Sequence, residues 1–306
     1  MNLYFAPMEG ITTYTYRNTH FELFGGCDEY YAPFIVPTDN ERISMKTLRD
    51  IVSENNIVKP KIQVMCTTGT AFCEFAKKVK NLGFNEVNLN LGCPSGTVVK
   101  KKRGSGALKD ADALDSFLDY IFSNADIDIT VKTRAGFYSH DEFPELLNIF
   151  SKYPIKELTI HPRVREEYYK GSPNIDTYRL AYNKQSLKLC YNGNIYSKSE
   201  YVGFLKEFPL TQSVMIGRGA VKNPAIFREI KGGEKLKTKE LIAFSNLLEK
   251  RYYELLDSDR YTLHRLKEIW IYIIQNFPEE SKIAKAIKKS GKLIELNNAI
   301  NCLPEL

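Results

Sequence analysis

The sequence lacks the long apolar run that a membrane-spanning helix requires, which is about 20 residues. Its first ten residues, MNLYFAPMEG, have neither the basic start nor the extended apolar stretch of a secretory signal. We therefore expect a cytoplasmic protein with no membrane partner.

Cysteine motifs are also missing. The six cysteines, at positions 27, 66, 73, 93, 190 and 302, form no Cys-x-x-Cys pair and no zinc-like spacing with the four histidines. A disulfide framework does not suit a chain of 306 residues, so we expect free, mostly buried thiols and no metal. Cys93 differs from the others because of its neighbours.

A glycine-rich dinucleotide-binding turn is absent too. A doubly wound sheet usually carries G-x-G-x-x-G after its first strand, but this chain reads APMEGIT there. The composition, 43% hydrophobic and 26% charged, is that of a globular protein. The net charge of +6 permits a polyanionic partner without requiring one.

What the sequence does contain is an alternation of short apolar strands and amphipathic helical segments. Eight strands are predicted, at residues 2–8, 28–34, 61–66, 86–92, 128–134, 157–163, 187–193 and 213–219. Between them lie segments such as GTAFCEFAKKVKNLG, in which Gly83 is expected to end a helix. Eight such units in about 230 residues predict an α/β fold of the TIM (β/α)8 barrel type.

The pattern changes near KGGEKLKT (231–238), after which only helical periods occur. We expect a barrel domain at 1–233 and a small all-helical domain at 236–306, joined by a Gly-Gly linker. One predicted helix, SKIAKAIKKSGKLIEL, has an apolar side with Ile283, Ile287 and Ile294. Its lysine side is either a solvated face or a surface for a polyanion.

In a TIM barrel the active site lies at the carboxyl ends of the strands. Seven of the eight predicted strands end there in a polar residue or a glycine. These residues are Pro7-Met8-Glu9, Gln63, Asn90 with Cys93, Lys132 with Arg134, His161, Asn192-Gly193-Asn194 and Gly217-Arg218-Gly219. A structural role could explain each one alone, but it explains the whole set poorly, so we predict one shared site.

The last two loops, YNGNI and IGRGA, follow strands seven and eight, where TIM barrels often bind phosphate. Arg218 would add a charge-assisted hydrogen bond to such an anion. Lys132 places a cation inside the mouth, which is costly unless a partner or ligand neutralises it. A phosphate-bearing cofactor with a polar ring would satisfy both observations.

The motifs together resemble those of the dihydrouridine synthases, flavoenzymes that reduce uridine in transfer RNA. The matching stretches are APMEGIT, LNLGCPSGTVVKKKRGSGAL, VKTRAGF, TIHPRVREEYYKG, YNGNI and IGRGAVKNPAIF, in family order across residues 6–227. The helical C-terminal segment also fits. Other FMN barrels share the phosphate loops but are not known for the Asn-x-Gly-Cys-Pro element with a basic loop after it.

The resemblance implies an FMN cofactor and NADPH, or sometimes NADH, as electron donor. The residues implied in FMN binding are Pro7, Met8, Glu9, Gln63, Lys132, His161, Asn192, Gly193, Asn194, Gly217 and Arg218. Many relatives have an aspartate where this chain has Asn194, so a charge is lost there. Gln63 and Lys132 would contact the polar edge of the flavin ring.

For the substrate, the resemblance implies that hydride goes to C6 of uracil and that Cys93 then gives a proton to C5. A thiol with an ordinary pKa of about 8.5 is mostly protonated at neutral pH, as an acid must be. Asn90, Arg134 and Tyr169 are implied in holding the base. The target base must leave its stack, and we expect the basic loop to contact tRNA phosphates as a flexible flap. Its cations are Lys100, Lys101, Lys102 and Arg103, followed by Gly104 and Gly106.

Three alternatives stay open from the sequence. The same chemistry could act on ribosomal RNA, or the barrel could be an FMN reductase of free pyrimidines. A non-catalytic RNA-binding protein on the same barrel is the third, and the presence of Cys93 and Lys132 argues against it. We expect a monomer.

Overall fold

Eight parallel strands form a closed barrel in the computed structural model, which describes residues 1–37, 44–278 and 281–306. The sheet order is β2-β1-β8-β7-β6-β5-β4-β3. The strands are β1 (Asn2–Phe5), β2 (Glu29–Tyr30), β3 (Ile62–Val64), β4 (Glu86–Leu91), β5 (Asp128–Gly136), β6 (Leu158–Val164), β7 (Leu189–Tyr191) and β8 (Ser213–Ile216). Each lies within or overlaps one predicted range, and the TIM-barrel prediction is confirmed.

The barrel closes between β2 and β3 by isolated bridges rather than by a continuous ladder. Tyr31 pairs with Lys61 and Ile35 with Val64, both in the parallel sense. The Lys61 N–H donates to the Tyr30 carbonyl at 2.8 Å, and the Ile35 N–H donates to the Gln63 carbonyl at 2.8 Å. These bonds remove the two sheet edges, which would otherwise expose unpaired backbone groups.

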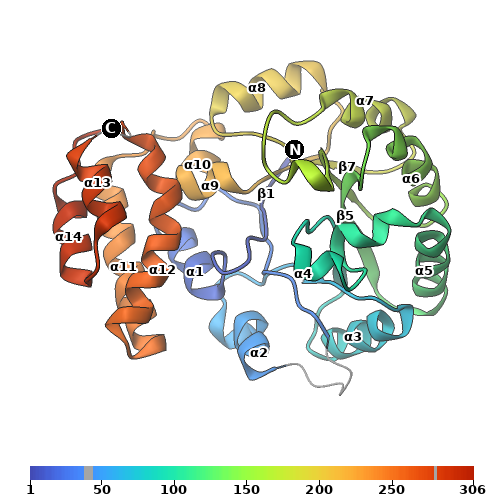
Figure 1. The fold of residues 1–306 in the computed structure, drawn as a ribbon, viewed down its shortest axis with the longest axis horizontal. Coiled ribbons are helices and arrows are strands. Elements are labelled where there is room, and N and C mark those ends of the chain that lie inside the picture. Colours follow the sequence, from blue (N-terminus) through green and yellow to red (C-terminus); the bar gives the residue numbers. More distant parts are fainter. Residues whose placement is uncertain (38–43, 279–280) are drawn as a thin grey trace.

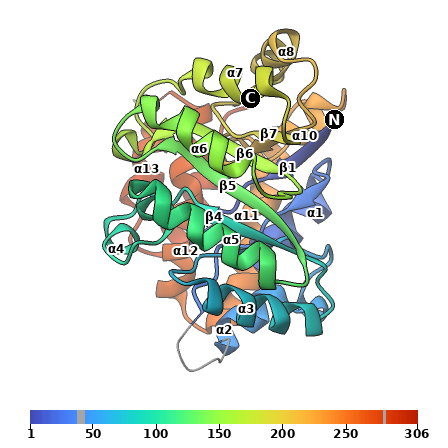
Figure 2. The same ribbon diagram turned by 90° about the vertical axis from the view of Figure 1, so that its right-hand side faces the viewer.

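Helices cover the outside of the barrel, as Figures 1 and 2 show from two directions. They are α1 (Tyr14–Leu23), α2 (Met45–Ile51), α3 (Gly69–Asn81), α5 (Ala111–Asn124), α6 (Phe143–Phe150), α7 (Ile175–Lys184), α8 (Lys198–Glu207), α9 (Arg218–Lys222) and α10 (Ile226–Ile230). The short helix α4 (Gly96–Val99) follows β4 and lies inside this ring in Figure 1. In α3 the residues at helical spacing from Phe72 to Val79 are buried. Gly83 follows with φ +85, and the N–H groups of Gly83 and Phe84 donate back to Lys80 and Val79, as expected for a glycine that ends a helix.

Four further helices gather at one side of the barrel, on the left of Figure 1. They are α11 (Thr238–Leu256), α12 (Asp259–Ile273), α13 (Lys282–Lys289) and α14 (Leu293–Asn301). The prediction of one helix across 281–296 is wrong, because α13 ends at Lys289 and α14 begins at Leu293, with a break at residues 290–292. That break leaves Ile294 62% exposed and buries Leu296 instead.

The helical segment packs directly on the barrel through α1. Phe244 of α11 meets the rings of Tyr16 and Phe24 edge-on, at centroid distances of 5.5 and 5.3 Å. Arg251 also forms an ion pair with Glu22 at 2.7 Å. The apolar core is therefore continuous from the barrel into α11 and α12. The domain boundary near Gly232 stays a prediction.

Within the described part of the chain, no helix is both long and apolar enough to cross a bilayer. The same residues contain no cluster of three or more histidine, cysteine, aspartate or glutamate side chains placed to hold a metal ion.

Candidate active site

The predicted site residues meet in one cavity at the carboxyl ends of the strands. Those that line it are Pro7, Met8, Glu9, Gln63, Asn90, Cys93, Lys132, Arg134, His161, Tyr169, Asn192, Gly193, Gly217 and Arg218. The remaining predicted residues, Asn194, Gly219 and the loop from Lys100 to Arg103, do not line it.

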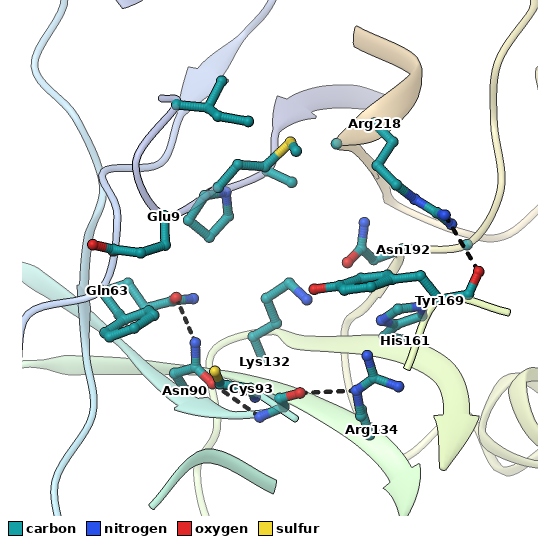
Figure 3. Close-up of a pocket in the computed structure, with 18 of the residues that line it drawn as sticks. Glu9, Gln63, Asn90, Cys93, Lys132, Arg134, His161, Tyr169, Asn192 and Arg218 are labelled. Carbon is teal, nitrogen blue, oxygen red and sulfur yellow. Dashed lines mark hydrogen bonds between the residues drawn. The ribbon is translucent and has the colours of Figure 1, made fainter. Parts of the chain in front are cut away.

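Sheet register explains why these side chains converge. Asn90 of β4 is paired with Lys132 of β5, and Arg134 of β5 is paired with His161 of β6. Residues in one row of a parallel sheet point to the same side, and alternate residues along each strand do so as well. Figure 3 shows Lys132 in the middle of the cavity, between Gln63 and Asn90 on one side and His161 and Tyr169 on the other.

A chain of amide hydrogen bonds runs through the barrel interior toward Cys93. The Asn88 amide donates to the Thr130 hydroxyl at 2.9 Å, and the Gln63 amide donates to Asn88 Oδ1 at 2.7 Å. Asn90 then donates to Gln63 Oε1 at 2.7 Å. Because each carboxamide is held by its neighbour, the rotamers of Gln63 and Asn90 are fixed before any ligand binds.

Asn90 also fixes the backbone of Cys93. Its Oδ1 atom accepts the N–H groups of Gly92 at 2.9 Å and of Cys93 at 3.0 Å. The Cys93 carbonyl accepts from both the N–H and the hydroxyl of Ser105, at 3.1 and 2.9 Å. Burial raises the pKa of the Cys93 thiol above its ordinary value. The thiol is therefore protonated at neutral pH and suited to donate a proton.

Lys132 and His161 give the cavity its electrostatic character. Burial, with a smaller contribution from Arg134, lowers the pKa of Lys132 to about 8. Burial and the surrounding cations lower the pKa of His161 well below its ordinary value, so His161 is neutral. Three cations, Lys132, Arg134 and Arg218, line the cavity with one carboxylate, Glu9, which favours an anionic ligand.

Arg134 is held by the backbone on three sides. Its Nε donates to the Gly92 carbonyl at 2.8 Å, Nη1 to Val164 at 2.9 Å and Nη2 to Tyr168 at 2.7 Å. These bonds tie the ends of β4, β5 and β6 together. A guanidinium has five N–H donors; the backbone takes three of them, and Arg134 also forms a side-chain hydrogen bond with Tyr169.

Tyr169 extends over the cavity and is 52% exposed. The guanidinium carbons of Arg134 and Arg218 lie 5.4 and 5.0 Å from its ring centroid, and the His161 ring stacks against it. Arg218 is held in turn by Asn194, whose Oδ1 accepts from it at 2.9 Å. Asn194 therefore acts behind the cavity wall rather than in it.

The basic loop lies on the rim of the site. Lys100, Lys101 and Lys102 are exposed, and the Arg103 Nε donates to the Thr67 hydroxyl at 2.8 Å. A β-carbon on Gly104, which has φ +55, would lie 2.8–3.1 Å from the Cys93 carbonyl oxygen, β-carbon and nitrogen. The glycine that we expected to give the loop mobility thus provides close packing under Cys93.

The sequence did not predict all the residues that build the site; Ala6, Ile11 and Gly92 also line the cavity. Phe34 lines the cavity after β2, at a strand end where only polar and glycine residues had been sought. Tyr272 reaches it from α12, although the helical segment gave no signal of a site residue. Arg163, two residues after His161 on β6, bonds to the side chains of both His161 and Asn194.

The donors present fit a flavin mononucleotide. Arg218 and the loops at Gly193 and Gly217 would hold its phosphate, while Gln63 and Lys132, which line the same cavity, would supply hydrogen bonds to the polar edge of its ring. A β-carbon on Gly217 would lie 3.3 Å from the Ala6 β-carbon and 3.7 Å from the Met8 sulfur, so the wall is closely packed at this glycine.

Comparison with known proteins agrees with this geometry. The model of the dihydrouridine synthase (Dus) family matches residues 4–303. The chain belongs to the dihydrouridine synthase family. The resemblance inferred from the motifs is thereby confirmed, and the family is one of oxidoreductases.

Individual relatives cover nearly the whole chain. A protein of Proteus vulgaris named tRNA-dihydrouridine synthase B is 27% identical over 305 residues, 95% of this chain and 92% of that protein. The tRNA-dihydrouridine(16) synthase of Neisseria meningitidis serogroup B is 26% identical over 281 residues, 87% of this chain and 83% of its own length.

A solved structure supports the fold. Histamine dehydrogenase from Rhizobium sp. 4-9 superposes with a TM-score of 0.56 at 10% identity over 76% of this chain. This chain spans about half of that protein, 45% of its length, so the likeness concerns the barrel fold alone.

Proposed function

We propose that this protein is an FMN-dependent tRNA-dihydrouridine synthase that uses NADPH or NADH to reduce specific uridines to 5,6-dihydrouridine. The observation that carries the proposal is the position of Cys93. Its protonated thiol lines the same cavity as Lys132 and the loops at Gly193 and Gly217. The names of the relatives from Proteus vulgaris and Neisseria meningitidis support tRNA as the substrate.

In this proposal the chain's residues bind, orient and protonate. Bound FMN would supply the hydride, drawn from the nicotinamide donor, that is added to C6 of the uracil ring. Asn90 and Arg134 hold the base, and Arg134 stabilises negative charge on its carbonyl oxygen. The Cys93 thiol gives its proton to C5, which balances the reduction of the double bond. Tyr169 covers the base.

The proposed division of labour places catalysis in residues 1–233 and RNA binding in the helical residues 236–306 together with the rim cations. The lysines at the rim, from Lys100 to Lys102, are exposed and so available to phosphates. Exposed lysines on α13 and just after it extend the same sign of charge; they are Lys282, Lys285, Lys289 and Lys292. We propose a cytoplasmic monomer.

The test is reduction of an unmodified tRNA transcript by the purified protein with FMN and NADPH, with dihydrouridine measured by mass spectrometry. Cys93→Ala should leave flavin reduction by NADPH intact and lower RNA reduction by orders of magnitude. Cys73→Ala, a half-buried thiol on α3 outside the cavity, is the matched control and should behave as the parent.

Other outcomes point to the alternatives. Turnover of ribosomal RNA but not tRNA would change the substrate, and efficient reduction of free uracil would indicate a pyrimidine reductase. A protein that binds RNA but no FMN would contradict the catalytic proposal altogether.

A further inference from the structure

Arg163 is a buried cation next to the candidate active site, and the proposed reaction gives this arginine no role. It lies on β6 and is 0% exposed. Its Nη1 bonds to His161 Nε2 at 2.9 Å, and its Nη2 donates to the Gly171 carbonyl at 2.6 Å and to Asn194 Oδ1 at 3.2 Å. Its Nε donates to the Lys170 carbonyl at 3.2 Å.

None of these acceptors carries a negative charge, and among the described residues Arg163 forms no ion pair. A buried guanidinium is costly unless its donors are satisfied. Here neutral oxygens and one imidazole nitrogen do so. Arg163 is therefore a desolvated cation whose contacts all lie along one wall of the cavity, which argues for a role beyond packing.

The contact with His161 decides where the imidazole proton lies. A guanidinium only donates hydrogen bonds, so Nε2 of His161 must present its lone pair to Arg163. In a neutral imidazole the proton is then on Nδ1. A doubly protonated ring would turn an N–H toward Arg163 and add a charge beside Lys132, Arg134 and Arg218.

We propose that Arg163 is a positioning residue that holds His161 neutral with its proton on Nδ1, so that the ring offers an N–H to an acceptor on the bound ligand. His161 lines the cavity and stacks against Tyr169, at a centroid distance of 6.0 Å. Among the described residues its ring forms no other hydrogen bond. The acceptor would be an oxygen or ring nitrogen of an anionic cofactor, and this step rests on the proposed function.

The same arginine connects His161 to the phosphate side of the cavity. Asn194 Oδ1 accepts from Arg163 and from Arg218. The carbonyls of Lys170 and Gly171 fix the loop that carries Tyr169. One side chain thus sets the positions of the three groups that close this wall, namely His161, Arg218 and Tyr169.

The test is a ¹⁵N NMR measurement of the imidazole nitrogens in the full chain without ligand. Only four histidines are present, so His161 is assigned by its loss in His161→Asn. We expect an Nδ1-protonated ring that stays neutral as the pH falls through the ordinary histidine pKa. An Nε2-protonated ring, or one that titrates near its ordinary pKa, would overturn the proposal.

Variants separate the role of Arg163 from packing. Arg163→Met should populate the Nε2-protonated form and move the titration to higher pH. Arg163→Gln keeps a neutral hydrogen-bond donor, so His161 should keep its proton on Nδ1 and only the pH at which the ring titrates should rise. Arg165→Met, two residues on and directed at the rings of Phe137 and Tyr168, is the control and should change neither. If Arg163→Met does not fold, Arg163→Gln decides: an unchanged titration overturns the proposal.

Ligand binding is measured separately, by quenching of FMN fluorescence. Arg163→Met should weaken FMN binding about tenfold, as expected for one impaired hydrogen bond to a charged group. If the parent protein binds no FMN, the proposed function fails while the NMR result still decides the role of Arg163. Equal FMN affinity in the parent and Arg163→Met would show that the His161 N–H does not serve the cofactor.

Discussion

Gly104 is the position where a single added methyl group should act on the thiol of Cys93, the proton donor of the proposed function. Its β-carbon would lie 2.8 Å from the Cys93 carbonyl oxygen, 2.9 Å from the Cys93 β-carbon and 3.1 Å from the Cys93 nitrogen. Restoring an ordinary separation of 3.4 Å requires Cys93 or Gly104 to move by about 0.3–0.6 Å. The residue also has φ +55, which an alanine adopts at a cost.

Two terms give the expected loss of stability in Gly104→Ala. Left-handed backbone at a non-glycine residue costs about 1–3 kcal/mol. Overpacking against a fixed backbone costs about 1–3 kcal/mol more. The variant should therefore be about 2–6 kcal/mol less stable in urea unfolding. Since misplacement of a reacting group by about 1 Å costs on the order of 100-fold in rate, we expect uridine reduction to fall about tenfold.

Two control variants isolate the contact with Cys93. Gly232→Ala introduces the same kind of strain, at φ +92, with nothing within 4 Å, and Gly96→Ala introduces neither strain nor contact. Flavin reduction by NADPH and uridine reduction are measured in single-turnover assays on folded protein. Uridine reduction in Gly104→Ala equal to that in Gly232→Ala would refute the packing argument.

Three further changes have defined outcomes. Lys132 has a pKa of about 8, below its ordinary value, so the affinity for FMN should fall as the pH rises through 8. Lys132→Met should bind FMN more weakly and lack this pH dependence. The same dependence of FMN affinity on pH in the parent and in Lys132→Met would contradict the role of the lysine charge. Tyr272→Ala should lower uridine reduction about tenfold, while exposed Tyr253→Ala should not. Ser245→Ala removes the acceptor of the Trp270 indole N–H at 3.0 Å and should cost about 1–2 kcal/mol, read from the fluorescence of this single tryptophan; an unchanged midpoint would contradict it.

The lowered pKa of Lys132 also makes the free energy of unfolding depend on pH. Because its folded pKa lies below that of the unfolded chain, the unfolded state binds more protons between about pH 8 and the ordinary lysine value. The contribution of Lys132 to folding therefore becomes more favourable as pH rises through this window. At neutral pH Lys132 stays charged despite the cost of desolvation, as expected if the negative charge of a bound ligand offsets that cost.

Strand periodicity predicted most of the residues that line the candidate site, because the pairing register of the strands determines which side chains point toward the mouth of the barrel. Once Asn90, Lys132 and His161 are placed on neighbouring parallel strands, pairing forces their side chains toward one mouth. The same rule missed Phe34, since an apolar residue at a strand end was not counted as a candidate. The strand rule does not apply to Tyr272, because which face of α12 meets the barrel depends on how α12 packs against α9 and α11.

Helical periodicity failed where local geometry overrode it. The segment from Lys282 onward has a repeating apolar pattern, yet Ser290 ends α13 by bonding to the Ile287 carbonyl, and Glu295 caps the next turn at Gly291. A polar cap at each end of a break changes the helix axis, so Ile294 falls on the outside. Composition alone favours one continuous helix, since lysine and isoleucine occur on both sides of the break.

The glycines after the basic run show why the presence of a glycine does not by itself predict whether it provides mobility or close packing. Glycine permits both motion and close approach, and both depend on the missing β-carbon. At Gly104 the space that a β-carbon would fill is occupied by Cys93, and at Gly106 it is occupied by the Val99 backbone at 2.9–3.0 Å. A loop packed this closely under the thiol fixes the position of Cys93 at the mouth of the cavity. In the proposed function the same packed loop would present the cations before it to RNA.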